Sequence, residues 1–448
     1  MSCMQSRRFR HWRPIFSFVL WAVLVVIVVH PAQAVTVQRV ISPQGIEAWL
    51  VEDHTNPILS VRFAFRGGAA LDPAGKEGLA RMVSVLLDEG AGSLDSQAFQ
   101  RKLEDLSVQL SFNTGRDTFS GRLKTLTKRR DEAFDLLRLA MTAPRFDTEA
   151  IERIRSQIIA GLKQNLEDPD SIASRALMKR LFPSHPYGRP VQGTIKSVKT
   201  IQKSDLQTFV KKRLARSKLI VGVVGDIRAD QLGKLLDQAF AKLPKEAASN
   251  SVKNVMPVTE GKTTVIKKQI PQSSIAFAQL GLKRNDPDFY TMFVLNYILG
   301  RGGFTSRLYL EVREKRGLAY SISTGLYPLE HAALLWGTSG TANKRAAETL
   351  KLVRAEWSRL AEKGVTVNEL KDAKTFLTGS FPLRFTSSGR IASILVSMQF
   401  NKLGIRYLDQ RNGFIEKVTL EGVNRLSKQM LDANKLSIVV VGSPRGVQ

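Results

Sequence analysis

Two polar side chains with complementary chemistry lie close together in the second half of this 448-residue chain. Arg313 belongs to a predicted helix that stops at Gly317, and Tyr320 opens the predicted strand that follows. A glycine just past the last turn commonly ends a helix, so the chain is expected to reverse there. This geometry brings one guanidinium and one phenol toward the same point, where they suit a peptide carbonyl or an oxyanion.

A glycine-rich stretch precedes this predicted helix. It contains Gly302, Gly303 and Phe304 but lacks the Gly-Lys-Ser/Thr ending of a phosphate-binding loop, so nucleotide binding is not expected. We interpret the stretch as a flexible turn that leads into the helix. Contact with a substrate is the second interpretation.

The segment 302–320 resembles the C-terminal signature of the insulinase, pitrilysin and mitochondrial processing peptidase family of zinc peptidases. The resemblance implies that Arg313 and Tyr320 hold the substrate carbonyl and stabilise the tetrahedral intermediate, opposite a zinc site in the first half. It also implies substrate contact for residues 302–304 and a peptide-aligning strand around Asn113. The alternative for the pair is structural, with an arginine that complements a helix dipole and a tyrosine in the core.

The first half lacks the zinc ligands that catalytic members of this family carry. In those members a helix bears the motif H-x-x-E-H, in which two histidines bind zinc and the glutamate acts as general base. Residues 78–80 mark the corresponding place, but the ligand positions hold Arg81, Ser84 and Val85, which form a degenerate motif. These side chains cannot bind zinc or deprotonate its water at neutral pH. The third ligand would fall near residues 160–161, where no acidic residue stands.

The other metal-binding residue types do not cluster in the sequence. After the first 34 residues the histidines are His54, His185 and His331, which are far apart and are interpreted as hydrogen-bonded or exposed. The only cysteine, Cys3, lies near the N-terminus. We therefore expect no metal and no cofactor bound by this chain, and we expect zinc in a partner subunit.

Residues 1–34 have the pattern of a cleavable signal peptide. Four arginines precede an apolar run at residues 15–29, and residues 32–34 are the small-residue sequence Ala-Gln-Ala. The apolar run is shorter than the roughly 20 residues that a spanning helix needs. We expect cleavage after Ala34 and a periplasmic protein, with an uncleaved membrane anchor as the alternative.

The composition is strongly basic. The formal net charge is +27, and removal of the four leader arginines leaves +23 because no acidic residue precedes residue 35. Such a surplus favours anionic partners, including an anionic membrane surface, but the leading interpretation is an ordinary solvated basic surface. Nucleic acid is not an expected partner, because lysines and arginines are spread along the chain without interleaved aromatic residues.

The two halves of the chain repeat each other. Three segments recur at offsets of 219, 220 and 217: residues 172–174 at 391–393, 195–198 at 415–418, and 218–225 at 435–442. Both halves mix strand-like alternation with helical spacing. These patterns predict an α+β fold with two homologous domains, each an antiparallel sheet with helices packed on one face. The predicted N-terminal domain spans 35–243, a polar linker spans 244–262, and the C-terminal domain spans 263–448.

Three functional hypotheses follow from these observations. The leading one is the non-zinc-binding, substrate-binding subunit of a two-chain periplasmic zinc metalloendopeptidase, which forms a heterodimer with a zinc-bearing homologue and contributes Arg313 and Tyr320 in trans. The second is a catalytically inactive binding or structural assembly protein of the same fold, which would need neither residue. The third is a self-sufficient peptidase that uses an unrecognised metal or no metal; without a metal it would need a Ser or Thr nucleophile and a base that the sequence does not reveal.

Overall fold

The computed structural model describes residues 36–248 and 251–447. The predicted signal peptide lies outside these residues. From Val37 onward the chain forms one compact unit. Within the described ranges, no helix combines the length and the apolar character needed to cross a membrane.

The first half is built on a six-stranded sheet with the strand order β1-β2-β6-β3-β5-β4. Its strands are β1 (Gln38–Ile41), β2 (Glu47–Glu52), β3 (Ile58–Arg66), β4 (Gln109–Thr114), β5 (Thr118–Leu126) and β6 (Leu219–Gly225). Its helices are α1 (Leu79–Leu86), α2 (Ser96–Asp105), α3 (Arg130–Thr142), α4 (Thr148–Glu167), α5 (Pro169–Leu181), α6 (Ile195–Thr200), α7 (Lys203–Arg213) and α8 (Ala229–Phe240). Neighbouring strands are antiparallel except β2 and β6, which are parallel.

The second half is built on a five-stranded sheet with the order β7-β11-β8-β10-β9. Its strands are β7 (Thr263–Lys267), β8 (Gln272–Leu280), β9 (Ala319–Pro328), β10 (Ala333–Ala342) and β11 (Ser437–Gly442). Its helices are α9 (Phe289–Asn296), α10 (Ala346–Lys363), α11 (Val367–Gly379), α12 (Ser388–Phe400), α13 (Tyr407–Glu416) and α14 (Leu420–Met430). The order repeats β2-β6-β3-β5-β4 strand for strand, including one parallel pair. The predicted fold of two homologous α+β domains is therefore confirmed.

A phenylalanine and a glycine mark the same point in both sheets. Phe63 on β3 lies opposite Gly121 on β5, and Phe277 on β8 lies opposite Gly337 on β10. A Cβ atom on either glycine would come within 2.1 Å of the opposite aromatic ring. Each ring therefore fills the space that its glycine leaves open, and each is fully buried in the core of its half.

The core of each half lies between its sheet and its own helices. Residues of β3 alternate, so that one face contributes Val61, Phe63 and Phe65 to a cluster with α1, α3 and α8. In the second half, Phe277 meets Trp357 of α10 edge to face at a centroid distance of 5.7 Å. Burial of these large aromatic side chains supplies much of the driving force for folding each half.

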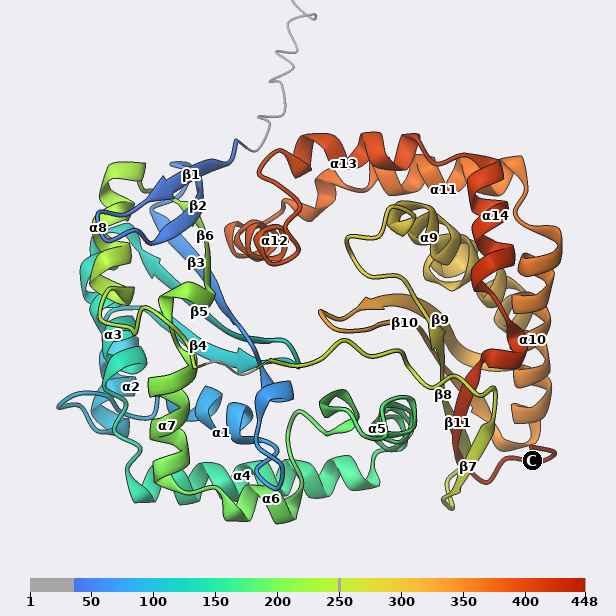
Figure 1. The fold of residues 1–448 in the computed structure, drawn as a ribbon, viewed down its shortest axis with the longest axis horizontal. Coiled ribbons are helices and arrows are strands. Elements are labelled where there is room, and N and C mark those ends of the chain that lie inside the picture. The colour runs from blue at the N-terminus through green and yellow to red at the C-terminus, as the bar shows by residue number, and fades with distance from the viewer. Residues whose placement is uncertain (1–35, 249–250, 448) are drawn as a thin grey trace, which may run out of the picture. The chain divides into compact units, whose positions relative to one another are not determined.

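The second face of each sheet is covered by a helix from the other half. Helix α5 of the first half packs on β8 and β11, and α12 of the second half packs on β3 and β6 (Figure 1). These two helices contain the repeated Ile-Ala-Ser segments at residues 172–174 and 391–393. At Gly222 of β6 a Cβ atom would lie 2.7 Å from the carbonyl oxygen of Ala392, so α12 approaches the sheet backbone closely.

The predicted linker is attached to both halves along its described part. Residues 251–262 form no helix or strand. The Val255 N–H donates to the carbonyl oxygen of His331, and the Val258 N–H donates to that of Leu181, each over 2.9 Å. Strand β7 begins at Thr263, directly after residue 262, which is the last residue of the predicted linker. The domain boundaries themselves stay predictions.

Candidate functional site

Helix α1 carries the three residues at the positions of the degenerate zinc motif. Arg81 and Val85 are partly exposed and one helical turn apart, whereas Ser84 is buried and its hydroxyl donates to the carbonyl oxygen of Arg81 over 2.8 Å. Helix α1 packs against α4, which holds Ala160 and Gly161 at the position of the third ligand. The supporting helices of a zinc site are thus in place, while these five positions offer neither an imidazole nor a carboxylate.

The histidines predicted to be hydrogen-bonded or exposed are engaged in local contacts. Nδ1 of His54 lies 2.7 Å from Oδ1 of Asp226. Nε2 of His185 lies 2.9 Å from the carbonyl oxygen of Lys253, and its Nδ1 accepts a hydrogen bond from the main-chain N–H of Tyr187. Burial lowers the pKa of His185.

The third histidine belongs to a group that sequence reasoning did not find. Donor atoms of Asp117, Glu330 and His331 lie within 4.8 Å of one another. Both oxygens of Asp117 are already used, since Oδ1 accepts from the Tyr187 hydroxyl at 2.6 Å and Oδ2 from the Glu330 N–H at 3.0 Å. Glu330 also pairs with Arg66 at 3.2 Å. We interpret the group as a polar junction between the halves, not as a metal centre.

Arg313 lies in a π-helical turn, Tyr309–Glu314, where the sequence predicted an ordinary helix. Its guanidinium stacks on the ring of Tyr309, 4.7 Å from the centroid, and no carboxylate of the described residues forms an ion pair with it. Gly317 lies just beyond this turn, has φ of 58° and donates from its N–H to the Arg313 carbonyl oxygen over 2.8 Å. The predicted reversal from helix into strand at this glycine is confirmed.

Tyr320 lies at a β-bulge at the start of β9. Ala319 pairs with Thr341 and Ser321 with Gly340, so Tyr320 is the extra residue between the two pairs. Its side chain is 66% exposed, so the alternative of a core tyrosine is wrong. Bulges re-aim side chains and are frequent beside functional sites.

The glycine-rich loop places an aromatic side chain next to this region. Phe304 is 71% exposed, and its ring meets that of Tyr309 at a centroid distance of 4.9 Å. Because Arg313 stacks on the same Tyr309 ring, the loop and the arginine are linked through one aromatic side chain. Gly302 and Gly303 form the short turn before it, and Gly303 has φ of 57°.

Asn113 lies on β4, the free edge strand of the first sheet, with its side chain exposed. It lines a cavity of about 400 Å³ together with Ser393 and Val396 of α12. The strand faces a helix of the second half across this cavity. Asn113 therefore lies in the other half of the chain, and on a different secondary-structure element, from Arg313 and Tyr320.

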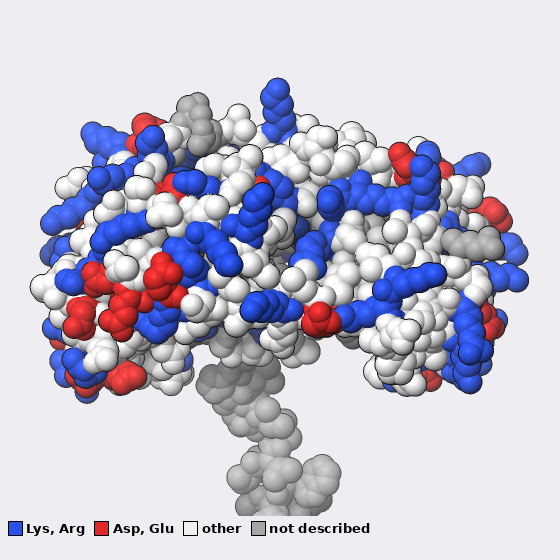
Figure 2. Space-filling view, turned by 90° about the horizontal axis from the view of Figure 1, so that it is seen from below, with Lys and Arg blue, Asp and Glu red and all other residues white. Residues whose placement is uncertain are grey.

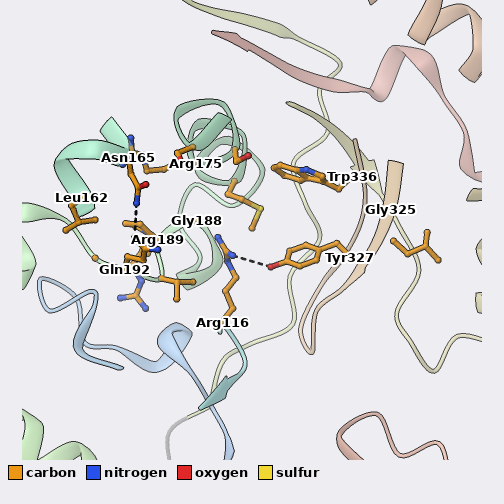
Figure 3. Close-up of a pocket in the computed structure, with 17 residues that line it drawn as sticks. Arg116, Leu162, Asn165, Arg175, Gly188, Arg189, Gln192, Gly325, Tyr327 and Trp336 are labelled. Carbon is orange, nitrogen blue, oxygen red and sulfur yellow. Dashed lines mark hydrogen bonds between the residues drawn. The ribbon is translucent and has the colours of Figure 1, made fainter. Parts of the chain in front are cut away.

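Two larger cavities meet at one shared wall. One has a volume of about 540 Å³ and the other of about 810 Å³, and both are lined by Arg116 and by residues 325–327 of β9. Arg116 Nη1 donates to the hydroxyl of Tyr327 over 3.3 Å, and Trp336 lies on the same side of the smaller cavity (Figure 3). Arg313 and Tyr320 are not among the residues that line these two cavities.

Arginine dominates the charge of both cavities. The arginines that line one or both are Arg116, Arg175, Arg189, Arg284, Arg301, Arg384 and Arg411. Asp117 is the single acidic residue among the lining residues. Figure 2 shows basic side chains around a hollow in the middle of one face. No pattern in the sequence predicted this cluster, because its members come from widely separated segments.

Comparison with known proteins agrees with the fold and with the degenerate motif. The description "Insulinase (Peptidase family M16)" matches residues 48–195, and "Peptidase M16 inactive domain" matches residues 200–377. The non-peptidase homolog YmxG of Helicobacter pylori is 29% identical over 396 residues, which cover 88% of this chain and 91% of that protein.

Two solved structures extend the comparison. The peptidase M16 inactive domain from Pseudomonas fluorescens is 30% identical with a TM-score of 0.86, and the match covers 92% of this chain and 99% of that one. The periplasmic protease PqqL from Escherichia coli is 16% identical with a TM-score of 0.77, covering 92% of this chain and 46% of that one, and shares the fold alone. The chain therefore belongs to the insulinase family, peptidase family M16, and is a member of its inactive type.

Proposed function

We propose that this chain is the non-zinc-binding, substrate-binding subunit of a two-chain zinc metalloendopeptidase. In this role it pairs with a homologue that carries the intact H-x-x-E-H motif and the zinc. Arg313 and Tyr320 then reach the partner's site, where the guanidinium holds the substrate carbonyl and the phenol stabilises the oxyanion. The substrate class is a peptide in an extended conformation.

One observation carries this proposal: Tyr320 is exposed and Arg313 is partly exposed, while the zinc-ligand positions of the first half hold no ligand. Tyr320 is exposed at a bulge, and Arg313 stacks on an aromatic ring and has no carboxylate partner among the described residues. If the pair had a structural role, the ring of Tyr320 would be expected to be buried or the charge of Arg313 to be paired with a carboxylate. Side chains that are available in this way can contribute to a catalytic site whose zinc is bound by another chain.

The second candidate function is a binding or assembly protein without any role in peptide hydrolysis. It is favoured by the match to an inactive domain and by the similarity to a relative described as a non-peptidase homolog. In that case Arg313 and Tyr320 would be dispensable. The two candidate functions therefore predict different effects on function when Arg313 and Tyr320 are replaced.

The proposed location is the periplasm. Support comes from the signal-peptide pattern of residues 1–34 and from the likeness of fold to a periplasmic protease. Fusion of the first 34 residues to a reporter that is active only after export tests this location. A reporter that stays in the cytoplasm contradicts it.

The test of the main proposal uses the chain from residue 35 onward, alone and mixed with a homologue from the same cell that carries H-x-x-E-H. Peptide cleavage is expected only in the mixture, and zinc only in the partner. Arg313→Ala and Tyr320→Phe in this chain should each lower cleavage by the mixture. Cleavage that is equal with the wild-type chain and with both variants removes the proposed role in trans and leaves the binding protein.

A further inference from the structure

We propose that the two adjoining cavities form a binding site for an acidic peptide in extended conformation. The proposal rests on the peptide-binding part of the proposed function and names the class of peptide. It does not depend on catalysis in trans. Four observations support it: the excess of arginine, the scarcity of carboxylate partners, the way the guanidinium groups are held, and the strand that runs past both cavities.

Six of the seven cavity arginines lack a carboxylate partner among the described residues. Among the seven, only Arg189 forms an ion pair within the described chain, to Glu77 at 3.8 Å. Asp117, the one acidic lining residue, is engaged by the Tyr187 hydroxyl and the Glu330 N–H instead. Guanidinium groups remain charged at any physiological pH. The site therefore presents several positive charges that are not paired with any carboxylate in the part of the chain that the structure describes.

Neutral oxygens and aromatic faces fix the positions of these charges. Arg284 donates to the hydroxyls of Tyr290 and Tyr407 at 3.0 and 3.1 Å and lies 4.2 Å from the ring centroid of Phe289. Arg116 donates from Nε to the Tyr187 carbonyl oxygen at 3.2 Å. Cations held in advance lose little freedom when a ligand binds, which favours affinity.

Arg411 is the most constrained of the group. It is 4% exposed, and its Nη1 donates to the carbonyl oxygen of Leu377 at 2.7 Å and to Oδ1 of Asn412 at 2.9 Å. Its guanidinium lies 4.3 Å from the centroid of Phe381. A buried charge without an opposite charge is costly for a fold, and an anionic ligand would offset that cost.

Edge strand β9 indicates that the anion belongs to a polypeptide. Residues 325–327 of β9 line both cavities, and β9 is the last strand of its sheet. Among the described strands it pairs with β10 alone, so its outer edge can accept an extended chain by strand addition. Trp336 and Tyr327 provide apolar surface for alternate side chains. A peptide with Asp or Glu at every second position matches both the edge and the arginines.

The experiment measures direct binding of a labelled peptide to the chain from residue 35 onward, without any partner. The probe is a fluorescent peptide in which Glu alternates with Val, and its matched control has Gln in place of Glu. We expect anisotropy to show binding of the Glu peptide, at least about tenfold weaker binding of the Gln peptide, and weakening of the Glu peptide in high salt.

Two triple variants separate the cavities from the general surface charge. Arg175→Gln, Arg301→Gln and Arg384→Gln together remove cavity cations that make no hydrogen bond or ion pair to other described residues. The control triple variant, Arg101→Gln with Lys234→Gln and Lys344→Gln, removes the same charge from exposed positions outside both cavities. The cavity variant is expected to bind about tenfold or more weakly with an unchanged melting temperature. The control variant is expected to bind normally.

Three results would overturn the proposal. The first is an equal loss of affinity for the Glu peptide in both triple variants, and the second is equal affinity for the Glu and Gln peptides. The third is that a DNA oligonucleotide or an anionic vesicle binds in a way that depends on the cavity arginines while the Glu peptide does not bind. Failure here leaves the role of Arg313 and Tyr320 in trans untouched, because that role is measured by cleavage in the mixture. Loss of that role would equally leave peptide binding by the single chain intact.

Discussion

Arg116 of the first half donates a hydrogen bond from Nη1 to the hydroxyl of Tyr327 in the second half, over 3.3 Å. This contact joins the turn between β4 and β5 to the edge strand β9. Both residues line both large cavities. The two halves of the duplicated chain thus share one wall of the candidate peptide site, and neither half alone contains it.

Tyr320→Phe in this chain is expected to lower kcat of the mixed enzyme by about 100-fold with little change in KM, because one oxyanion donor typically contributes that much. Steady-state kinetics with a fluorogenic peptide provide the measurement. Lys344→Ala, an exposed cation on the same half, is the control and should leave kcat unchanged. A rise in KM alone would mean that Tyr320 binds the ground state and not the transition state.

The purified chain from residue 35 onward is expected to contain no stoichiometric zinc, because Arg81, Ser84 and Val85 offer no ligand at neutral pH. Atomic emission analysis after dialysis against zinc measures this. The partner homologue serves as the positive control. Tightly bound metal in the single chain, or hydrolysis by it that a chelator abolishes, would contradict the assignment to the non-zinc subunit.

Gly222→Ala is expected to destabilise the fold by about 2 kcal/mol, because the added Cβ would lie 2.7 Å from the Ala392 carbonyl oxygen and 2.9 Å from the Leu395 Cβ. Urea unfolding measures the change. Gly161→Ala on α4 is the matched control, since its Cβ would meet nothing within 4 Å. That control should be stabilised by about 0.5 to 1 kcal/mol. Equal effects at both positions would show that α12 does not press on β6.

Glu311 predicts a dependence of stability on pH. Hydrogen bonds from Lys315 and then Arg316 lower the pKa of Glu311 from 4.5 to about 2. The folded pKa is depressed, so this contribution is present above pH 4.5 and is lost as the pH falls toward 2. Glu311→Gln should lower the free energy of unfolding at pH 7 by about 1 kcal/mol after solvent screening.

The measurement is urea unfolding of wild type and Glu311→Gln at several pH values between neutral and acid. The difference in the free energy of unfolding between the two proteins should become smaller as Glu311 becomes protonated in the folded wild type. Glu314→Gln is the control, because Glu314 is exposed and forms no ion pair with other described residues. A difference that stays constant with pH would mean that packing, not charge, is lost.

Local patterns in the sequence were sufficient for most of the fold. Alternation at residues 58–65 predicted β3, helical spacing at 150–166 predicted α4, and the recurring segments predicted two domains of one topology. Gly317 predicted the reversal before Tyr320. These features depend on short-range periodicity and on backbone conformation, which neighbouring residues determine.

Features that depend on long-range packing could not be predicted from the sequence. The π-helical geometry around Arg313 and the bulge at Tyr320 arise from how the segment meets its sheet, and periodicity does not encode either. The arginine cluster was even less accessible, because Arg116 and Arg411 become neighbours of one cavity only after both halves have folded. Dispersed lysine and arginine in the sequence therefore suggested an ordinary basic surface.

The exchange of α5 and α12 between the halves has a consequence for the origin of the chain. A single half, cut from the other, would leave an apolar sheet face bare and a helix without a surface to cover. Two identical copies of such a half could satisfy each other by trading that helix. The present chain has the architecture of such a swapped dimer fused into one polypeptide, and its linker converts a concentration-dependent assembly into one that forms within a single molecule.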